Sequence, residues 1–330
     1  MAKKVLVTGC SGYLGTVLVN ALLEHPLVTR VVGIDLSPSK VSSPKFKHYA
    51  ADIRDEFLLR SIIEDEGVDV VYHLAFMMGE PRDEVLARAI NVGGTLTVLE
   101  ACAKSSTVQK LILSGSASAY GAKRRNPEFL REDEPLRADT LRYGIHKRLV
   151  EEELAKSLPG VRSSLRVVVL RICTIVGGGE RADGPVKLFC ETPFSVSVLF
   201  RKGALQFIAE ADLMKVMVKA MEASELRGAF NVGPDDYTTL AQISARLGKP
   251  RFPLPYSFLW LALFLIRRVN PKSSATEKIV SYLAYPAVVS NAKIKKALGV
   301  TFQKGSLEAF IDCARTLADS PSLTRERSLV

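Results

Sequence analysis

The stretch of sequence that decides the fold is KVLVTGCSGYLG, residues 4–15. An apolar run ends there in a loop with glycines at positions 9, 12 and 15, and the helical pattern TVLVNALLEH follows. Glycines at such a junction permit a tight turn and let a pyrophosphate approach the backbone N–H groups at the start of the helix. We therefore predict a dinucleotide site at Gly9, Gly12 and Gly15, with Tyr13 and Leu14 between them.

Apolar runs and helical patterns alternate over the residues that follow, at the spacing of βαβ units. VDVVYHLAF (68–76), QKLILSGS (109–116) and RVVVLRICTIVG (166–177) are continuously apolar rather than alternating. Continuous apolar strands are covered on both faces, as in a parallel sheet with helices on each side. The predicted class is α/β, a doubly wound parallel sheet of the Rossmann type with a smaller C-terminal substrate or cap domain.

Two regions are predicted along the chain. The glycine-rich polar stretch GGGERADGP (177–185) has no periodicity, and core-like patterns return only near residue 205. We assign residues 1–175 and about 205–235 to the dinucleotide-binding domain. Residues 176–204 and 236–330 are assigned to the cap.

Composition and charge exclude several classes of protein. Hydrophobic residues make up 47% and charged residues 24% of the 330, which are globular proportions. Residues 241–330 carry 14 Lys and Arg against 5 Asp and Glu, whereas residues 1–240 are nearly balanced at 31 against 30. No recognised nucleic-acid motif accompanies this basic quarter, and we predict no nucleic-acid partner.

Five scattered cysteines and four histidines form no disulfide framework or metal-ligand spacing. We therefore predict a reducing compartment and no metal. The N-terminus lacks the long apolar run of a signal peptide, so a cytoplasmic location is expected.

The choice of dinucleotide rests on Asp35, which ends the second strand-like run, 20 residues after Gly15, and is followed by Leu36. A carboxylate there accepts hydrogen bonds from the ribose hydroxyls and repels a 2′-phosphate. NAD is therefore predicted over NADP. Lys40, five residues further on, leaves a phosphate contact open.

The candidate catalytic residues are Ser116, Tyr143 and Lys147. Tyr143 and Lys147 are four residues apart in a helical pattern, so both side chains project from one face. A phenol with a pKa of about 10 needs a neighbouring ammonium to work as an acid–base catalyst near neutrality. Lys147 can provide that charge, and Ser116, at the end of a neighbouring strand, can polarise the substrate oxygen.

These motifs together resemble the extended short-chain dehydrogenase/reductase family, also called the NAD-dependent epimerase/dehydratase family. The matches are TGCSGYLG, AADIRD, YHLAF, NVGGT, SGSASAYG and YGIHK, within the first 235 residues. The resemblance implies that Ser116, Tyr143 and Lys147 form the catalytic set. The cofactor contacts it implies, beyond the glycine loop, are Asp52 and Ile53 beside adenine, Leu74, Ala75 and Phe76 along the cofactor, Asn91, and Ser114, Tyr143, Lys147 and Ile172 around the nicotinamide.

Two departures bear on the substrate. Sugar-nucleotide members carry an Asn where Thr174 stands here, and three glycines replace their usual Gly-Pro ending. FLWLALFLI (258–266), followed by Arg267 and Arg268, resembles the C-terminal region of 3β-hydroxysteroid and sterol dehydrogenases. The segment is too short to span a bilayer, which takes ~20 residues, and a buried cap helix, a lid and an interfacial helix all fit it.

The sequence therefore leaves three functions open. The first is an NAD-dependent oxidoreductase acting on a secondary alcohol or ketone of an apolar, steroid- or isoprenoid-like molecule. The second is a nucleotide-sugar 4-epimerase or dehydratase with tightly held NAD, and the third is a non-catalytic redox-sensing regulator. We also expect a homodimer formed by the Tyr143 helix and the helix near residues 86–103, and peripheral membrane contact through residues 258–268.

Overall fold

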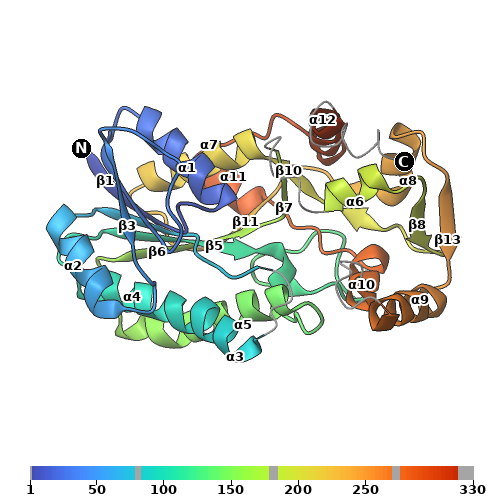
Figure 1. Cartoon of the computed structure of the whole chain (residues 1–330), viewed down its shortest axis with the longest axis horizontal. Coiled ribbons are helices and arrows are strands. Elements are labelled where there is room, and N and C mark those ends of the chain that lie inside the picture. Colours follow the sequence, from blue (N-terminus) through green and yellow to red (C-terminus); the bar gives the residue numbers. More distant parts are fainter. Residues whose placement is uncertain (1, 79–82, 178–184, 270–275, 319–330) are drawn as a thin grey trace.

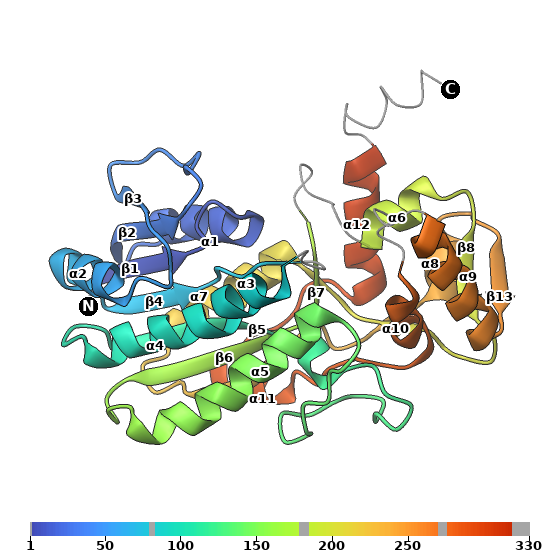
Figure 2. The same ribbon diagram turned by 60° about the horizontal axis from the view of Figure 1, so that its bottom comes forward.

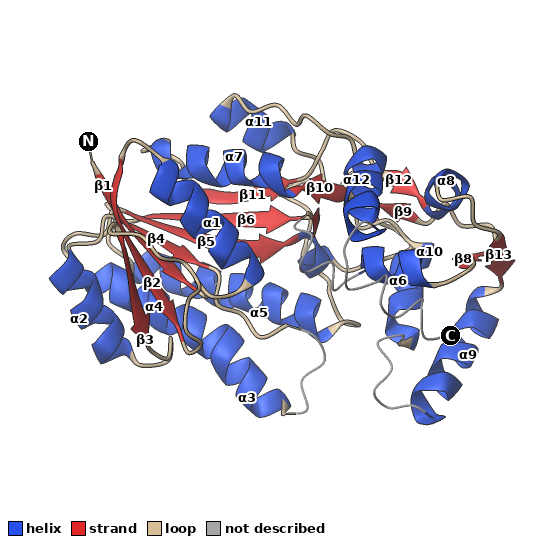
Figure 3. Ribbon diagram, turned by 45° about the horizontal axis from the view of Figure 1, so that its top comes forward, coloured by secondary structure: helices blue, strands red, loops and turns tan. Residues whose placement is uncertain are grey.

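The computed structural model describes residues 2–78, 83–177, 185–269 and 276–318. A seven-stranded sheet forms its centre, with all of its strands parallel (Figures 1 and 3). In spatial order the strands are β11 (Gly228–Val232), β6 (Arg166–Ile172), β5 (Lys110–Ser116), β4 (Val70–His73), β1 (Lys3–Thr8), β2 (Val28–Asp35) and β3 (Phe46–Ala50). The predicted doubly wound α/β class is confirmed.

Helices cover both faces of this sheet, as the continuous apolar strands require (Figures 1 and 2). One face is packed by α1 (Tyr13–Glu24), α7 (Glu210–Glu222) and α11 (Ala292–Leu298). The other is packed by α2 (Glu56–Glu66), α4 (Gly94–Lys104) and α5 (Arg142–Ser157). Each face has its own apolar core, so every central strand is buried on both sides.

The strand order reverses between β1 and β4, which lie side by side in register from Val5 opposite Val70 to Thr8 opposite His73. From this point the chain winds outward in both directions. In open α/β sheets the crevice beyond the carboxyl ends of the strands at such a switch point is where ligands bind. The glycine loop follows β1 at this position.

One continuous helical run, Glu84–Lys104, is long and apolar enough to cross a membrane by length and composition. It joins α3 (Glu84–Arg88), a π-helical turn (Ala89–Gly93) and α4, and half of its apolar window is buried. Val92, Val98 and Leu99 belong to the core beneath the sheet. The run is therefore a sheet-covering helix in this fold.

The rest of the chain forms a smaller region at one end of the sheet (Figures 1 and 3). It contains the strand pairs β7–β10 (Thr174–Val176, Phe207–Ala209), β9–β12 (Ala204–Leu205, Thr238–Thr239) and β8–β13 (Ser195–Val198, Arg251–Leu254). Its helices are α6 (Pro185–Glu191), α8 (Leu240–Arg246), α9 (Tyr256–Val269), α10 (Val280–Ala284) and α12 (Ser306–Ala318). The boundaries of the two predicted regions remain a prediction. Helix α11, which falls within the residues assigned to the cap, packs against β11 and α7 beside the sheet.

Candidate active site

The glycine loop is a backbone-only surface at the switch point. Gly9 has φ +71°, and a Cβ atom there would lie 2.7 Å from the backbone N of Ala75. A Cβ atom on Gly15 would lie 2.0 Å from the carbonyl oxygen of Gly9. Helix α1 starts after Gly12 with no side-chain cap, so its first N–H groups remain available to an anion. These features fit a pyrophosphate, as the spacing predicts.

Asp35 lies at the carboxyl end of β2, directly beside the loop. Its carboxylate accepts hydrogen bonds from the backbone N–H groups of Ser11 (3.1 Å) and Ser37 (2.9 Å). The group is therefore held at the position where an adenosine ribose would meet the glycine loop. Leu36, which follows it, exposes 70% of its surface.

The three candidate catalytic residues come together at the carboxyl end of β5. Ser116 ends that strand, and Tyr143 of α5 lies close enough for the Ser116 hydroxyl to lower the pKa of its phenol. Lys147, one helical turn further along α5, places its Nζ 5.6 Å from the centre of the Tyr143 ring. Strand β5 thus supplies the serine, and helix α5 supplies both the tyrosine and the lysine.

Lys147 is buried beside an aromatic ring. Its Nζ lies 3.7 Å from the centre of the Phe76 ring and donates a hydrogen bond to the carbonyl oxygen of Ser114 at 2.5 Å. Burial lowers the pKa of this lysine to about 7, and Glu151 acts in the opposite direction. Burial raises the pKa of Tyr143, while the Ser116 hydroxyl acts in the opposite direction.

A buried chain of hydrogen bonds lies beneath Lys147 and was not predicted. His73 at the end of β4 pairs its Nδ1 with the hydroxyl of Thr8 at 2.8 Å and its Nε2 with the hydroxyl of Thr95 at 2.9 Å. Burial lowers the pKa of His73 to about 3, and Lys147 adds to the effect. The imidazole is therefore neutral near pH 7.

Asn91, predicted as a cofactor contact, is buried and fully engaged within the protein. Its Oδ1 accepts from the backbone N–H of Met77 at 2.7 Å, and its Nδ2 donates to the Met77 carbonyl at 3.0 Å. The same Nδ2 lies 3.1 Å from Nδ1 of His146, whose Nε2 lies 3.1 Å from Glu84. Asn91 thus joins the loop after β4 to the helix that carries Tyr143 and Lys147.

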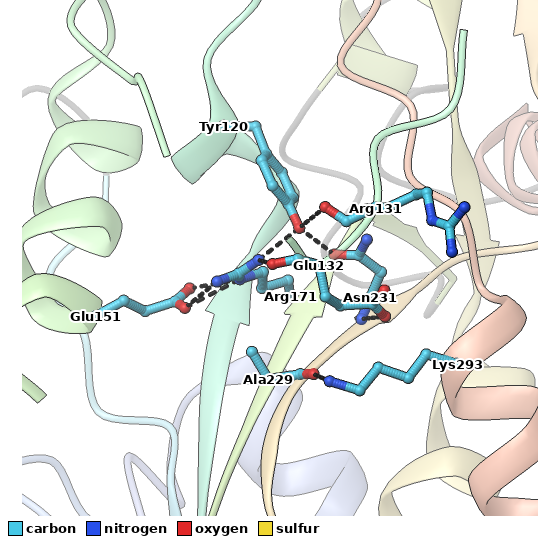
Figure 4. A network of polar contacts seen from close by, with 8 residues as sticks. All are labelled: Tyr120, Arg131, Glu132, Glu151, Arg171, Ala229, Asn231 and Lys293. Carbon is cyan, nitrogen blue, oxygen red and sulfur yellow. Dashed lines mark hydrogen bonds and ion pairs between the residues drawn. The ribbon is translucent and has the colours of Figure 1, made fainter. Parts of the chain in front are cut away.

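Behind the site, a second polar network joins α5 to the sheet (Figure 4). Arg171 on β6 donates from Nε and Nη2 to both carboxylate oxygens of Glu151 at 2.8–3.1 Å, and each side chain is 9% exposed. Arg171 also donates to the hydroxyl of Tyr120 at 2.6 Å, and that hydroxyl lies 2.8 Å from Oδ1 of Asn231 on β11. Glu151 follows Lys147 by one turn, so this pair fixes the catalytic helix.

The other predicted cofactor residues lie around the same crevice. Leu74 and Ala75 follow β4 and donate their backbone N–H groups to Thr8, at the base of the glycine loop. Ile172 pairs with Ser116 at the ends of β6 and β5. Asp52 binds Arg54, which lowers the pKa of the carboxyl, and the buried side chain of Ile53 packs against Gly94.

Tyr13 links the glycine loop to the helix after β10. Its hydroxyl donates to the carboxylate of Glu210, the first residue of α7. Leu14 packs against the core on the α1 face. Residues 178–184 of the predicted glycine-rich insertion lie outside the described residues, and within the described part no cluster of three or more His, Cys, Asp or Glu side chains could hold a metal.

Comparisons with known proteins place this geometry in a family. Residues 5–233 match the family model described as NAD dependent epimerase/dehydratase family. An uncharacterized protein of Mycobacterium tuberculosis is 28% identical over 331 residues, which cover 98% of this chain and 87% of that protein. A UDP-glucose 4-epimerase of Lactobacillus helveticus is 30% identical over 244 residues, which cover 72% of this chain and 64% of the epimerase.

Solved structures share the fold. The Bordetella bronchiseptica enzyme WbmG, in complex with NAD, superposes with a TM-score of 0.74 at 18% identity, covering 96% of this chain and 94% of WbmG. A UDP-glucose 4-epimerase of Thermotoga maritima with UDP-glucose gives 0.70 at 22% identity, covering 96% and 100%. The expected closer similarity to sterol-type members is not supported, because the relative and the solved structure whose names state an activity are UDP-glucose 4-epimerases.

Proposed function

The chain belongs to the NAD dependent epimerase/dehydratase family, and from that membership we propose that it moves a hydride between a carbinol carbon of a small-molecule substrate and NAD, with Ser116, Tyr143 and Lys147 as the catalytic residues. It is an NAD-dependent enzyme of the extended short-chain dehydrogenase type. The observation that supports the assignment of the residues is that Tyr143 lies close to both Ser116 and Lys147, at the edge of the sheet that carries the glycine loop.

Each residue has a defined task in this proposal. NAD, when bound, supplies the hydride acceptor or donor. As the substrate alcohol is oxidised, Oη of Tyr143 takes the hydroxyl proton, and the Ser116 hydroxyl donates a hydrogen bond to the same substrate oxygen. In the reverse direction Tyr143 returns the proton to that oxygen.

Lys147 sets the proton affinity of Tyr143. A phenolate buried next to an ammonium is stabilised, whereas one buried alone is not. The pKa of Lys147, lowered by burial to about 7, means that its charged form is present below that pH and is lost above it. Electrostatic support for the Tyr143 phenolate is therefore greatest where the lysine keeps its proton.

For the substrate, we propose a nucleotide-linked sugar, oxidised and reduced again within one catalytic cycle. The support comes from the relatives, which include UDP-glucose 4-epimerases, and from fold neighbours crystallised with UDP or UDP-glucuronic acid. A second candidate is a secondary alcohol or ketone of an apolar molecule. Thr174 favours it, because this residue replaces the Asn of sugar-nucleotide members.

The experiment that tests the proposal compares wild-type protein with Tyr143→Phe. We expect turnover to fall at least ~100-fold, the range for loss of a general acid–base group, while NAD affinity measured by calorimetry stays the same. Interconversion of sugar nucleotides without net NADH formation supports the first substrate class. Net NADH formation from apolar alcohols supports the second, and full activity of Tyr143→Phe on a confirmed substrate would refute the assigned mechanism.

We also propose that two copies associate through α4 and α5, in isologous symmetry. Sedimentation should then give twice the chain mass of 36.1 kDa at micromolar concentration. A monomer across that range excludes this interface. The cytoplasmic location stays a prediction.

A further inference from the structure

Helix α9 turns an apolar face to solvent. Among its described residues only Leu259 is buried, packed with Val198, Val280 and Ala284. Eight large apolar side chains of this one helix are at least 36% exposed: Tyr256, Phe258, Trp260, Leu261, Phe264, Leu265, Ile266 and Val269. The structure therefore excludes the plain buried cap helix among the alternatives that the sequence left open.

The exposed side chains follow the helical period. Phe258, Leu261 and Leu265 are spaced by three and four residues, so they share one face, and they are 59%, 49% and 52% exposed. Trp260 and Phe264 are four residues apart and stack with ring centres 5.3 Å apart. A contiguous apolar surface of this kind on a soluble domain marks an interaction site.

Two long stretches of sequence in and around the lobe that carries α9 contain no acidic residue. We define this end lobe as β8, β13, α9 and α10, which lie together at the end of the molecule farthest from β3 (Figure 1). Residues 192–209 and 237–276 contain no Asp or Glu. The Lys and Arg residues of these two stretches are Arg201, Lys202, Arg246, Lys249, Arg251, Arg267, Arg268 and Lys272.

Some of these cations border the apolar surface. Arg267 and Arg268 form the last turn of α9, and Arg268 is exposed. Phe200 follows β8 with 93% of its surface exposed and φ +58°, a backbone conformation that costs energy for a residue with a side chain. Arg201 and Lys202 come directly after it. The end lobe thus combines exposed aromatic rings with an excess of positive charge, although Glu277 lies in the short turn between α9 and α10.

We propose that the end lobe docks on an anionic lipid surface, with α9 lying along the interface. The helix has 14 residues, about 21 Å at 1.5 Å per residue, which is too short to cross the ~30 Å hydrocarbon layer. A second copy of the chain would bring its own cations against the same cations. Lipid phosphates instead neutralise them while the acyl boundary covers the apolar side chains. The proposal is independent of the substrate.

Trp260 provides the measurement, because it is the single tryptophan of the chain. Full-length protein is titrated with vesicles of phosphatidylcholine alone or of equimolar phosphatidylcholine and phosphatidylglycerol. We expect a blue shift of Trp260 emission, protection from an aqueous quencher and co-sedimentation with the anionic vesicles. High salt should weaken binding, because part of the attraction is electrostatic.

Variants separate the apolar and the charged contributions. Phe258→Gln, Leu261→Gln and Leu265→Gln together should lower partition into anionic vesicles at least about tenfold. The matched control is Phe57→Gln with Val85→Gln, two apolar residues on α2 and α3 that are 86% and 81% exposed. It should bind as wild type does. Arg267→Gln with Arg268→Gln should reduce partition by roughly fivefold for each charge removed.

Two outcomes overturn the proposal. One is the absence of any Trp260 shift or co-sedimentation with anionic vesicles at low salt. The other is a blue shift that grows with protein concentration without lipid, because it identifies a second copy as the occupant of α9. Retained circular dichroism and NAD affinity in the triple variant show that lost binding is not lost folding.

Discussion

Replacing Glu151 with Gln tests how the catalytic helix is held and charged. In the wild type, three hydrogen bonds of 2.8–3.1 Å join its carboxylate to Arg171, and both side chains are 9% exposed (Figure 4). Glutamine has nearly the same shape, keeps one oxygen acceptor and removes the negative charge. The guanidinium of Arg171 then remains buried without a counter-charge.

Two effects follow, with magnitudes set by burial. Breaking a buried ion pair from one side costs about 3–5 kcal/mol, and we expect the lower end here. Arg171 still donates to the hydroxyl of Tyr120 and to the carbonyl of Glu132 in the variant. The second effect is on Lys147, whose pKa Glu151 raises against burial. Without that carboxylate the pKa of Lys147 must fall below about 7. At a pH above this pKa, each further unit by which the pKa falls lowers the fraction of charged Lys147 about tenfold.

The assay combines stability with titration. Denaturant unfolding at pH 7 gives the loss of free energy, and NMR of ¹³C-methylated lysines gives the pKa of Lys147, assigned by its absence in Lys147→Met. The pH dependence of turnover should move to lower pH in Glu151→Gln. Glu132→Gln is the matched control, since Glu132 accepts one hydrogen bond from the backbone of Asn231 in the same network.

Two results would contradict the reasoning. An unchanged or higher pKa of Lys147 in Glu151→Gln would show that the carboxylate does not act on the lysine. A loss of stability no greater than that of Glu132→Gln would show that the pair with Arg171 does not hold the helix.

Three further predictions concern the rest of the site. Asp35→Asn should weaken NAD and relieve the penalty on NADP, which calorimetry with both dinucleotides measures; unchanged selectivity would assign the choice to another residue. Tyr13→Phe and Glu210→Gln each remove the same hydrogen bond, so their effects on the free energy of unfolding should be non-additive in a double-mutant cycle. Lys110, with its pKa lowered by burial to about 8, donates to the carbonyl of Ala220. Wild-type stability should therefore rise with pH between about 8 and 10.5, a slope that Lys110→Met lacks.

The sequence was sufficient where the signal is local. A glycine loop between an apolar strand and a helix is one continuous segment. The sequence therefore predicts both its residues and its ligand, a dinucleotide. Tyr143 and Lys147 share a helix, and their spacing of four residues fixes their proximity. Asp35 could be placed because it ends the strand next to β1.

The sequence was insufficient where partners come from distant elements. Arg171 and Glu151 each occur in an ordinary motif, and only the parallel pairing of β5 with β6 and the packing of α5 bring them together. Hydropathy shows that residues 258–266 are apolar but does not show which neighbours cover them. That depends on a small lobe whose β8 and β13 strands lie more than fifty residues apart.

The buried His73 is neutral, which leaves Lys147 as the cation of the site. Thr95 donates its hydroxyl hydrogen to the carbonyl of Asn91 at 2.6 Å, so it accepts from Nε2–H of His73. Nδ1 then carries no hydrogen and accepts from the hydroxyl of Thr8, which in turn accepts from the N–H of Ala75 at 3.3 Å. Each N–H or O–H group in this row of hydrogen bonds therefore has an acceptor, and all of the bonds point the same way.

Protonating His73 would turn Nδ1 into a second donor facing the Thr8 hydroxyl. Thr8 could no longer donate to the ring, and a second positive charge would stand next to Lys147. Both consequences agree with a His73 pKa of about 3. If His73 is neutral from pH 4 upward, its ring carbons should show no titration by NMR there, and His73→Gln should raise the pKa of Lys147 little. A His73 titration near pH 6 would contradict the burial argument and would show that the site can hold a second cation.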